Sequence, residues 1–179
     1  TDEGSPGRDW NVATGMVIEG KAGFQIMGDW AKGEFTAAGK VPGVDYYCAP
    51  TPSNNGYLYN VDSFIFYKTS DPDKQEGQKL LAKLMMGKNF QKVFNLYKGS
   101  IPARLDVSMD EFDKCAKTSN SDIKTAGASG GLVPSFAHGM AQGNTMKAAL
   151  QDVITEHFNS DMSSVDAANA LADSVLDNM

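Results

Sequence analysis

Residues 20–35, GKAGFQIMGDWAKGEF, set the layout expected for the chain. The apolar run FQIM at residues 24–27 lies between two glycines, which is the pattern of a short strand covered on both faces. Asp29 follows, where its carboxylate could cap a helix. Trp30 would then lie in the first helical turn, near the carboxyl end of the strand, where open α/β sheets bind ligands. Its indole is either a core side chain or a platform for stacking.

The composition is that of a globular, soluble protein. The 179 residues are 41% hydrophobic and 21% charged, enough for one domain or for part of a two-domain protein. No apolar run approaches the roughly 20 residues of a membrane helix, so we expect no membrane insertion. The net charge of -6 argues against nucleic acid as a partner, because phosphate binding needs clustered Lys and Arg. The acidic start, TDEGSPGRDW, has no signal-peptide pattern, and we expect a processed or excised beginning.

Helical periodicity dominates the chain, especially its carboxyl half. We expect helices near residues 9–20, 29–39, 71–87 and 89–99, one that starts at the Ser108–Glu111 capping box, and two near residues 146–158 and 165–176. Strands are expected at residues 24–27 and 57–68, extended chain at 40–52, and a turn at 53–56. About three or four strands against about seven helices predict an α/β fold that is helix-rich in its carboxyl half.

The sequence offers no motif for catalysis or for a metal. It has no GxSxG nucleophile motif, and the glycines at residues 127–131 lack the lysine of a P-loop. A glycosidase-like pair of carboxylates stays open, but no pair stands out. His138 and His157 show no metal spacing with the two cysteines. We therefore expect no catalytic residues, no metal and no cofactor. Cys48 and Cys115 fit a disulfide and two buried thiols equally well.

Four side chains fit the demands of a sugar, which are an aromatic face and charged or planar hydrogen-bonding groups. Trp30 could stack on a sugar ring, or belong to the core. Asp62 could bind hydroxyls, or accept hydrogen bonds in its own turn. His138 lies in a glycine-bordered loop and is either functional or simply exposed. Arg104, which follows Pro102, could reach a pocket or tie its loop to a helix end.

Taken in order, these segments resemble a known family. The residues that carry the resemblance are the stretch 20–35, the run NVDSF at 60–64, the loop KGSIPAR at 98–104 and the two late helices. The chain is similar to the carboxyl-terminal portion of an extracellular solute-binding protein, family 1, of an ABC sugar importer, of the glucose- and mannose-binding type. The resemblance implies that residues 1–179 form one lobe of a two-lobe periplasmic-binding-protein fold, with the amino-terminal lobe absent from this chain.

The resemblance also implies a function. Such a protein is not an enzyme: it binds a glucose-like monosaccharide between its lobes in the periplasm and delivers it to the permease subunits. Trp30 would stack on the sugar, Asp62 would accept from two hydroxyls, and His138 would bind another hydroxyl, whereas the position of Arg104 is often structural. A periplasmic location would favour a Cys48–Cys115 disulfide. The alternatives are a lobe for an oligosaccharide or polyol, a carbohydrate-active enzyme, and a structural module without a ligand.

Overall fold

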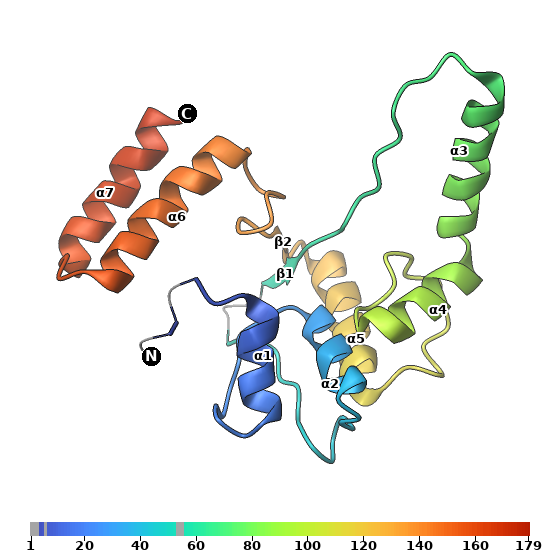
Figure 1. Cartoon of the computed structure of the whole chain (residues 1–179), viewed down its shortest axis with the longest axis horizontal. Coiled ribbons are helices and arrows are strands. Elements are labelled where there is room, and N and C mark those ends of the chain that lie inside the picture. The colour runs from blue at the N-terminus through green and yellow to red at the C-terminus, as the bar shows by residue number, and fades with distance from the viewer. Residues whose placement is uncertain (1–3, 6, 53–55) are drawn as a thin grey trace. The chain divides into compact units, whose positions relative to one another are not determined.

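The computed structural model describes residues 4–5, 7–52 and 56–179, and the chain divides into two compact units (Figure 1). We call the first the strand-pair unit; it contains Gly56–Asp62 and Leu132–Met179, together with Thr1–Pro6. The second, the helical unit, contains Gly7–Asn55 and Ser63–Gly131. Each unit is therefore built from separate stretches of sequence.

The helical unit consists of helices joined by long segments without regular secondary structure. Its elements are α1 (Trp10–Ile18), the 3-10 helix η1 (Asp29–Ala31), α2 (Lys32–Ala37), α3 (Pro72–Met85), α4 (Lys88–Lys98) and α5 (Lys114–Ser129). The core is small, and much of it lies around α2 and α5, where Phe35 and Ala116 are buried. The ring of Phe35 stacks on Tyr46, with 4.2 Å between the ring centroids, so the loop after α2 folds back onto that helix.

Several helix boundaries are those predicted from capping chemistry. Asp71 caps α3 by accepting hydrogen bonds from the amides of Asp73 and Lys74, with Pro72 in the first turn. Helix α4 ends at Gly99, whose φ of 89° is left-handed and favours glycine. These local signals depend on neighbouring residues alone, which is why the sequence was sufficient to find them.

The covered strand predicted at residues 24–27 is wrong. The segment is not a strand, and Phe24 and Ile26 are 96% and 82% exposed. In the part of the chain that the structure describes, strand pairing is limited to two short strands and an isolated bridge between Pro42 and Tyr46. An apolar run indicates a preference for burial, but a strand also needs a neighbour to complete its backbone hydrogen bonds.

Two predicted caps are also wrong, because the side chains bond elsewhere. Asp29 lies inside η1, and its Oδ2 accepts a hydrogen bond from the amide of Ile101. The Ser108–Glu111 segment forms a turn in which the hydroxyl of Ser108 bonds to Asp110. Helix α5 begins later, at Lys114, with Asp113 as its cap. In both places, the side chain that the local spacing predicted as a helix cap instead makes its hydrogen bond within a turn or with a distant residue.

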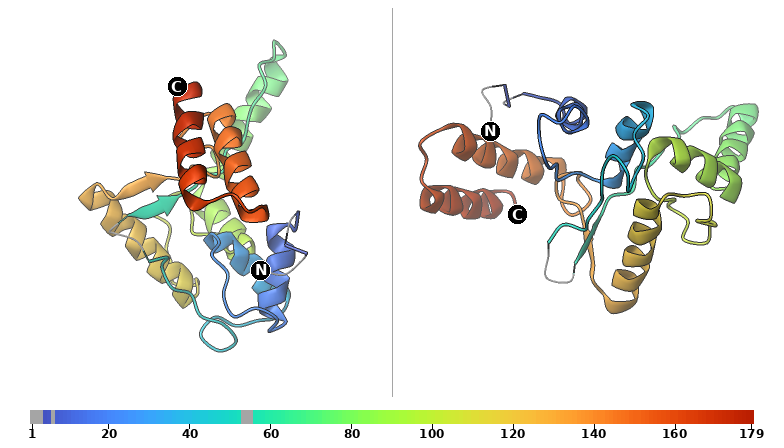
Figure 2. Two further views of the ribbon diagram at one scale, coloured as in Figure 1. Left: turned by 90° about the vertical axis from the view of Figure 1, so that its left-hand side faces the viewer. Right: turned by 90° about the horizontal axis from the view of Figure 1, so that it is seen from below.

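The strand-pair unit contains β1 (Tyr57–Tyr59) and β2 (Leu132–Pro134), which run parallel (Figure 2). The long predicted strand at 57–68 is thus right at its start and wrong beyond Tyr59, and the predicted turn at 53–56 lies, except for Gly56, outside the described residues. The two predicted late helices follow as α6 (Asn144–Asn159) and α7 (Ser164–Asp177), and the structure packs them against each other. The fold is a helix-rich α/β chain with a small parallel sheet.

Candidate functional site

Asp62 and His138 both follow the carboxyl ends of the two paired strands. Because β1 and β2 are parallel and Tyr59 pairs with Pro134, the segments that carry these residues leave the sheet at the same edge. The carboxyl ends of parallel strands are where α/β sheets place ligand-binding groups, and we call this end of the strand pair the sheet edge. The strand pair therefore brings two of the four predicted residues into one short region, although they are far apart in sequence.

The imidazole of His138 is oriented by a buried serine. The Oγ of Ser135 lies 2.7 Å from Nδ1 of His138, and Ser135 is only 2% exposed. The backbone of Ser135 is fixed too: its amide donates to the carbonyl of Tyr59 at 2.8 Å, and its carbonyl accepts from Met140 at 2.9 Å. A histidine held through Nδ1 presents Nε2 on the other side of the ring, in a defined direction.

The carboxylate of Asp62 is exposed and has a neighbouring amide as a partner. The Nδ2 of Asn60 donates to its Oδ1 at 3.2 Å. An ionised carboxylate can accept several hydrogen bonds at once. Asp62 is therefore suited to hydroxyl groups that approach the edge of the sheet.

Trp30 belongs to the helical unit and is half-buried. Its indole lies against Gly28: a Cβ atom on residue 28 would overlap three carbons of the six-membered ring, Cζ3, Cη2 and Cε3. Trp30 is thus neither a fully buried core residue nor a side chain that projects into solvent. A half-buried indole is compatible with a role as a stacking platform.

The turn that carries Trp30 is bonded to the loop after α4. The carboxylate of Asp29 accepts from the amide of Ile101 at 2.8 Å, next to Ser100, which is buried. Burial raises the pKa of Asp29, although the Ile101 amide and the charge of Lys32 act in the opposite direction. The GDW turn and the KGSIPAR loop, which the sequence presents as separate motifs, are one structural feature.

Arg104 is engaged inside the helical unit. Its Nε and one terminal nitrogen donate to the two carboxylate oxygens of Asp106, each at 2.8 Å, and the other terminal nitrogen donates to the carbonyl of Met86 at 3.2 Å. The hydrogen bond from Arg104, assisted by Lys88, holds the pKa of Asp106 well below its usual range. These contacts tie the loop to the end of α3, which is the structural alternative for Arg104.

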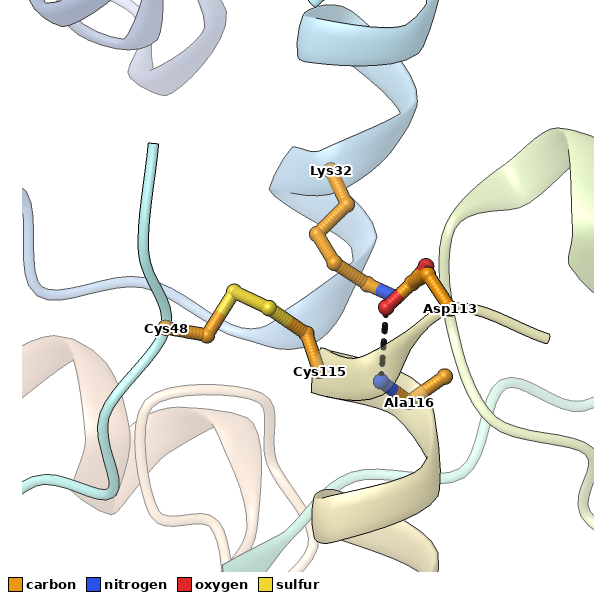
Figure 3. The surroundings of a disulfide bond; sticks show 5 residues. All are labelled: Lys32, Cys48, Asp113, Cys115 and Ala116. Atoms are coloured by element: carbon orange, nitrogen blue, oxygen red, sulfur yellow. Dashed lines mark hydrogen bonds and ion pairs between the residues drawn. A yellow bond between two sulfur atoms is a disulfide. The ribbon is translucent and has the colours of Figure 1, made fainter. Parts of the chain in front are cut away.

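A disulfide joins Cys48, in the loop after α2, to Cys115 in the first turn of α5 (Figure 3). The two Cα atoms are 5.6 Å apart. Beside it, the buried ammonium of Lys32 lies 2.7 Å from Oδ2 of Asp113, whose other oxygen accepts from the amide of Ala116 at 2.9 Å. Burial opposes ionisation of Asp113, but the bonds from Lys32 and Ala116 outweigh it, so its pKa is lowered.

The four predicted residues are divided between the units: Asp62 and His138 lie in the strand-pair unit, Trp30 and Arg104 in the helical unit. Sequence reasoning missed the supporting residues, which are Gly28, Asn60 and Ser135. Only Ser135 had a readable signal, since a serine three residues before a loop histidine can reach its ring. Within the described ranges, no group of three or more His, Cys, Asp or Glu side chains could hold a metal ion. The helices described there are all too short or too polar to cross a membrane.

Comparison with known proteins points to one class. No family model matches the chain. It is 47% identical over 175 residues to a "Probable sugar-binding periplasmic protein" of Brucella suis, covering 97% of this chain and 41% of that protein. A protein of the same name from Rhizobium meliloti is 45% identical over 175 residues, covering 97% and 42%. An "Uncharacterized ABC transporter extracellular-binding protein" of Pyrococcus horikoshii is 34% identical over 150 residues, covering 83% and 33%.

The similarity thus covers most of this chain but less than half of the length of each relative. The chain spans about two fifths of the length of the curated relatives just named from Brucella and Rhizobium. Their names describe sugar-binding proteins rather than enzymes, and they agree with the periplasmic location expected from the sequence. The names give no particular sugar.

Proposed function

We propose that this chain is the carboxyl-terminal lobe of a periplasmic substrate-binding protein that delivers a glucose-like monosaccharide to an ABC permease. The observation that carries the proposal is the similarity, over 97% of the chain, to a protein named for sugar binding. The geometry supports it independently, because Asp62 and His138 share the ligand-binding edge of a parallel strand pair. In this proposal the chain performs no covalent chemistry and needs no cofactor.

Each side chain has a distinct proposed task. Asp62 accepts hydrogen bonds from neighbouring sugar hydroxyls, and charge strengthens these bonds. His138 binds a further hydroxyl through Nε2, since its Nδ1 bonds to Ser135. The indole of Trp30 stacks on the C–H face of the ring. Arg104 acts by holding the shape of its loop rather than by touching the sugar.

The rest of the binding cleft belongs, in this proposal, to the length that the relatives have beyond the matched region. The exposed surface supports this view, because the chain exposes 12551 Å². Two separate compact bodies that divide its mass as the units do would expose about 10,000 Å². The excess includes large apolar side chains that a further part of the protein could cover: Phe24, Ile26, Phe64, Ile65, Leu80, Leu84 and Tyr97. Closure of two lobes around the sugar would change the surface that the permease contacts.

The test is a binding assay on the complete polypeptide that contains this chain. Titration calorimetry with D-glucose, D-mannose, D-xylose and maltose should show saturable binding of a monosaccharide, with the sugar recovered unchanged. Preference for maltose would favour the oligosaccharide alternative, and conversion of the sugar would indicate an enzyme. Binding of none of the sugars would contradict the proposal. Asp62→Asn should weaken binding on the order of tenfold, in line with the loss of a charged hydrogen bond, without lowering the melting temperature.

A further inference from the structure

The indole of Trp30 occupies the space that a side chain on residue 28 would fill. An ideal Cβ on Gly28 would overlap Cζ3, Cη2 and Cε3 of the ring. Gly28 has φ -70° and ψ 165°, an extended conformation that every residue adopts easily. The backbone therefore does not require glycine at this position. Glycine is needed here because the indole of Trp30 occupies the position of a Cβ atom.

The backbone around Trp30 is held by contacts that do not involve its ring. The amide of Ala31 donates to the carbonyl of Gly28 at 3.1 Å, and Asp29 accepts from Ile101 at 2.8 Å. Immediately afterwards the start of α2 touches the end of α4, since a Cβ on Gly33 would lie 2.8 Å from the carbonyl oxygen of Lys98. The backbone of Trp30 is thus held in place, so an indole displaced from Gly28 would have to move by its side-chain torsions.

From these contacts we infer that Gly28 is a positioning residue: it sets where the Trp30 indole lies, and through it the sugar affinity, without touching the sugar. This inference rests on the proposed function, in which Trp30 stacks on the sugar. The atoms that an added methyl group would meet belong to the indole ring of Trp30 and not to backbone. A larger residue at position 28 would therefore turn the indole away while leaving the fold intact.

The experiment uses the complete polypeptide with Trp10→Phe, which removes the other of the two tryptophans in this chain. Any tryptophan outside this chain is replaced by Phe as well. In that background, Gly28→Ala should change the near-UV circular dichroism and the emission maximum of Trp30, before any sugar is added. Affinity for the tightest-binding sugar of the panel above should fall on the order of tenfold, with stacking as the guide. The urea midpoint should stay unchanged.

Two glycine variants are matched controls. Gly15→Ala adds the same methyl group inside α1, where nothing lies within 4 Å, so it should change neither spectrum nor affinity. Gly33→Ala meets a backbone carbonyl instead and should lower the urea midpoint. If Gly28→Ala lowers the midpoint as Gly33→Ala does, residue 28 supports the fold and the inference is wrong.

Trp30→Ala separates this inference from the proposed function. If that variant binds sugar normally, Trp30 does not stack, and the proposed function loses this contact whatever Gly28 does. If Trp30→Ala weakens binding while Gly28→Ala leaves the spectrum or the affinity unchanged, the inference about Gly28 is overturned and the role of Trp30 stands. Weaker binding by both variants, with a changed spectrum for Gly28→Ala, supports the inference.

Discussion

The Nζ of Lys32 lies 2.7 Å from Oδ2 of Asp113, and only 7% of the Lys32 side chain is exposed. The same carboxylate caps α5 through the amide of Ala116, one residue beyond the disulfide cysteine of that helix. An ion pair, a helix cap and a covalent link therefore coincide at the start of α5. This junction joins α2, α5 and the loop that carries Cys48.

Replacing Asp113 should destabilise the protein strongly. Asp113→Ala leaves the buried ammonium of Lys32 without its partner and α5 without its cap, for a loss of roughly 3 kcal/mol. Urea denaturation at pH 7 measures it. Asp113→Ser with Lys32→Met keeps a capping oxygen and removes the buried charge, so it should recover most of the loss. Unchanged stability of Asp113→Ala would mean that the pair contributes nothing.

Acid should weaken this junction. The pKa of Asp113 is lowered in the fold from its ordinary value of 3.8, so the unfolded chain binds a proton more readily. The contribution of Asp113 is fully present above pH 3.8 and is lost as the pH falls through the folded pKa. Melting temperatures between pH 6 and pH 2 should show this decline. Asp113→Asn should lack that part of it, and identical pH profiles would rule Asp113 out as its source.

Asp29 should have the opposite pH dependence. Burial raises its pKa, so the folded state binds a proton more readily, and stability falls as the pH rises from 3.8 through the folded value. Asp29→Asn keeps an acceptor for the Ile101 amide and removes the charge, so it should match or exceed wild-type stability at pH 7. Asp29→Ala leaves that amide without its acceptor and should cost about 1 to 2 kcal/mol. Equal losses for both variants, in urea denaturation, would contradict this account.

The disulfide should contribute a large share of the stability. Cys48→Ala with Cys115→Ala should lower the free energy of unfolding by about 2 to 4 kcal/mol. The disulfide joins residues 67 apart in the sequence and so reduces the conformational entropy of the unfolded chain. Thiol titration in denaturant should find neither cysteine reactive before reduction and both reactive afterwards. Two reactive thiols in the unreduced protein would exclude the link.

Ser135 should matter for binding more than for folding. Ser135→Ala removes the hydroxyl that holds Nδ1 of His138 but keeps the backbone bonds to Tyr59 and Met140. Sugar affinity should fall about fivefold, as for one neutral hydrogen bond, while the melting temperature changes little. Ser129→Ala, whose hydroxyl bonds to carbonyls of α5, is the matched control and should bind normally. Equal affinity of the two variants would remove Ser135 from the site.

The features that the sequence predicted well are local. The caps of α3 and α4 need only adjacent residues, and both late helices follow from their apolar spacing. Asp62 and His138 could each be singled out from their own turn or loop, but their shared position depends on the pairing of β1 with β2, which the sequence did not predict. Charge and hydrogen-bonding capacity made these residues conspicuous before any geometry was known.

The features that the sequence missed depend on partners distant in the chain. Phe24 and Ile26 have the pattern of a buried strand, but pattern cannot supply the strand that would pair with them. Asp29 has the spacing of a helix cap, yet its carboxylate accepts a hydrogen bond from the amide of Ile101, 72 residues away in the sequence. The sequence did not indicate a role for Gly28, because the proposed role depends on the absence of a Cβ atom. Only the structure shows that the Trp30 indole occupies the position of that atom.

The disulfide also affects the two strands that precede Asp62 and His138. It shortens the loop of chain that is closed when β1 pairs with β2. Without the link, pairing β1 with β2 closes a loop of about 70 residues; through Cys48 and Cys115 the shortest path is about 30 residues. The entropy of loop closure favours the shorter path by on the order of 1 kcal/mol. Reducing a bond in the helical unit should therefore make the strand pair harder to form from the unfolded chain, although it breaks no contact of the strand-pair unit.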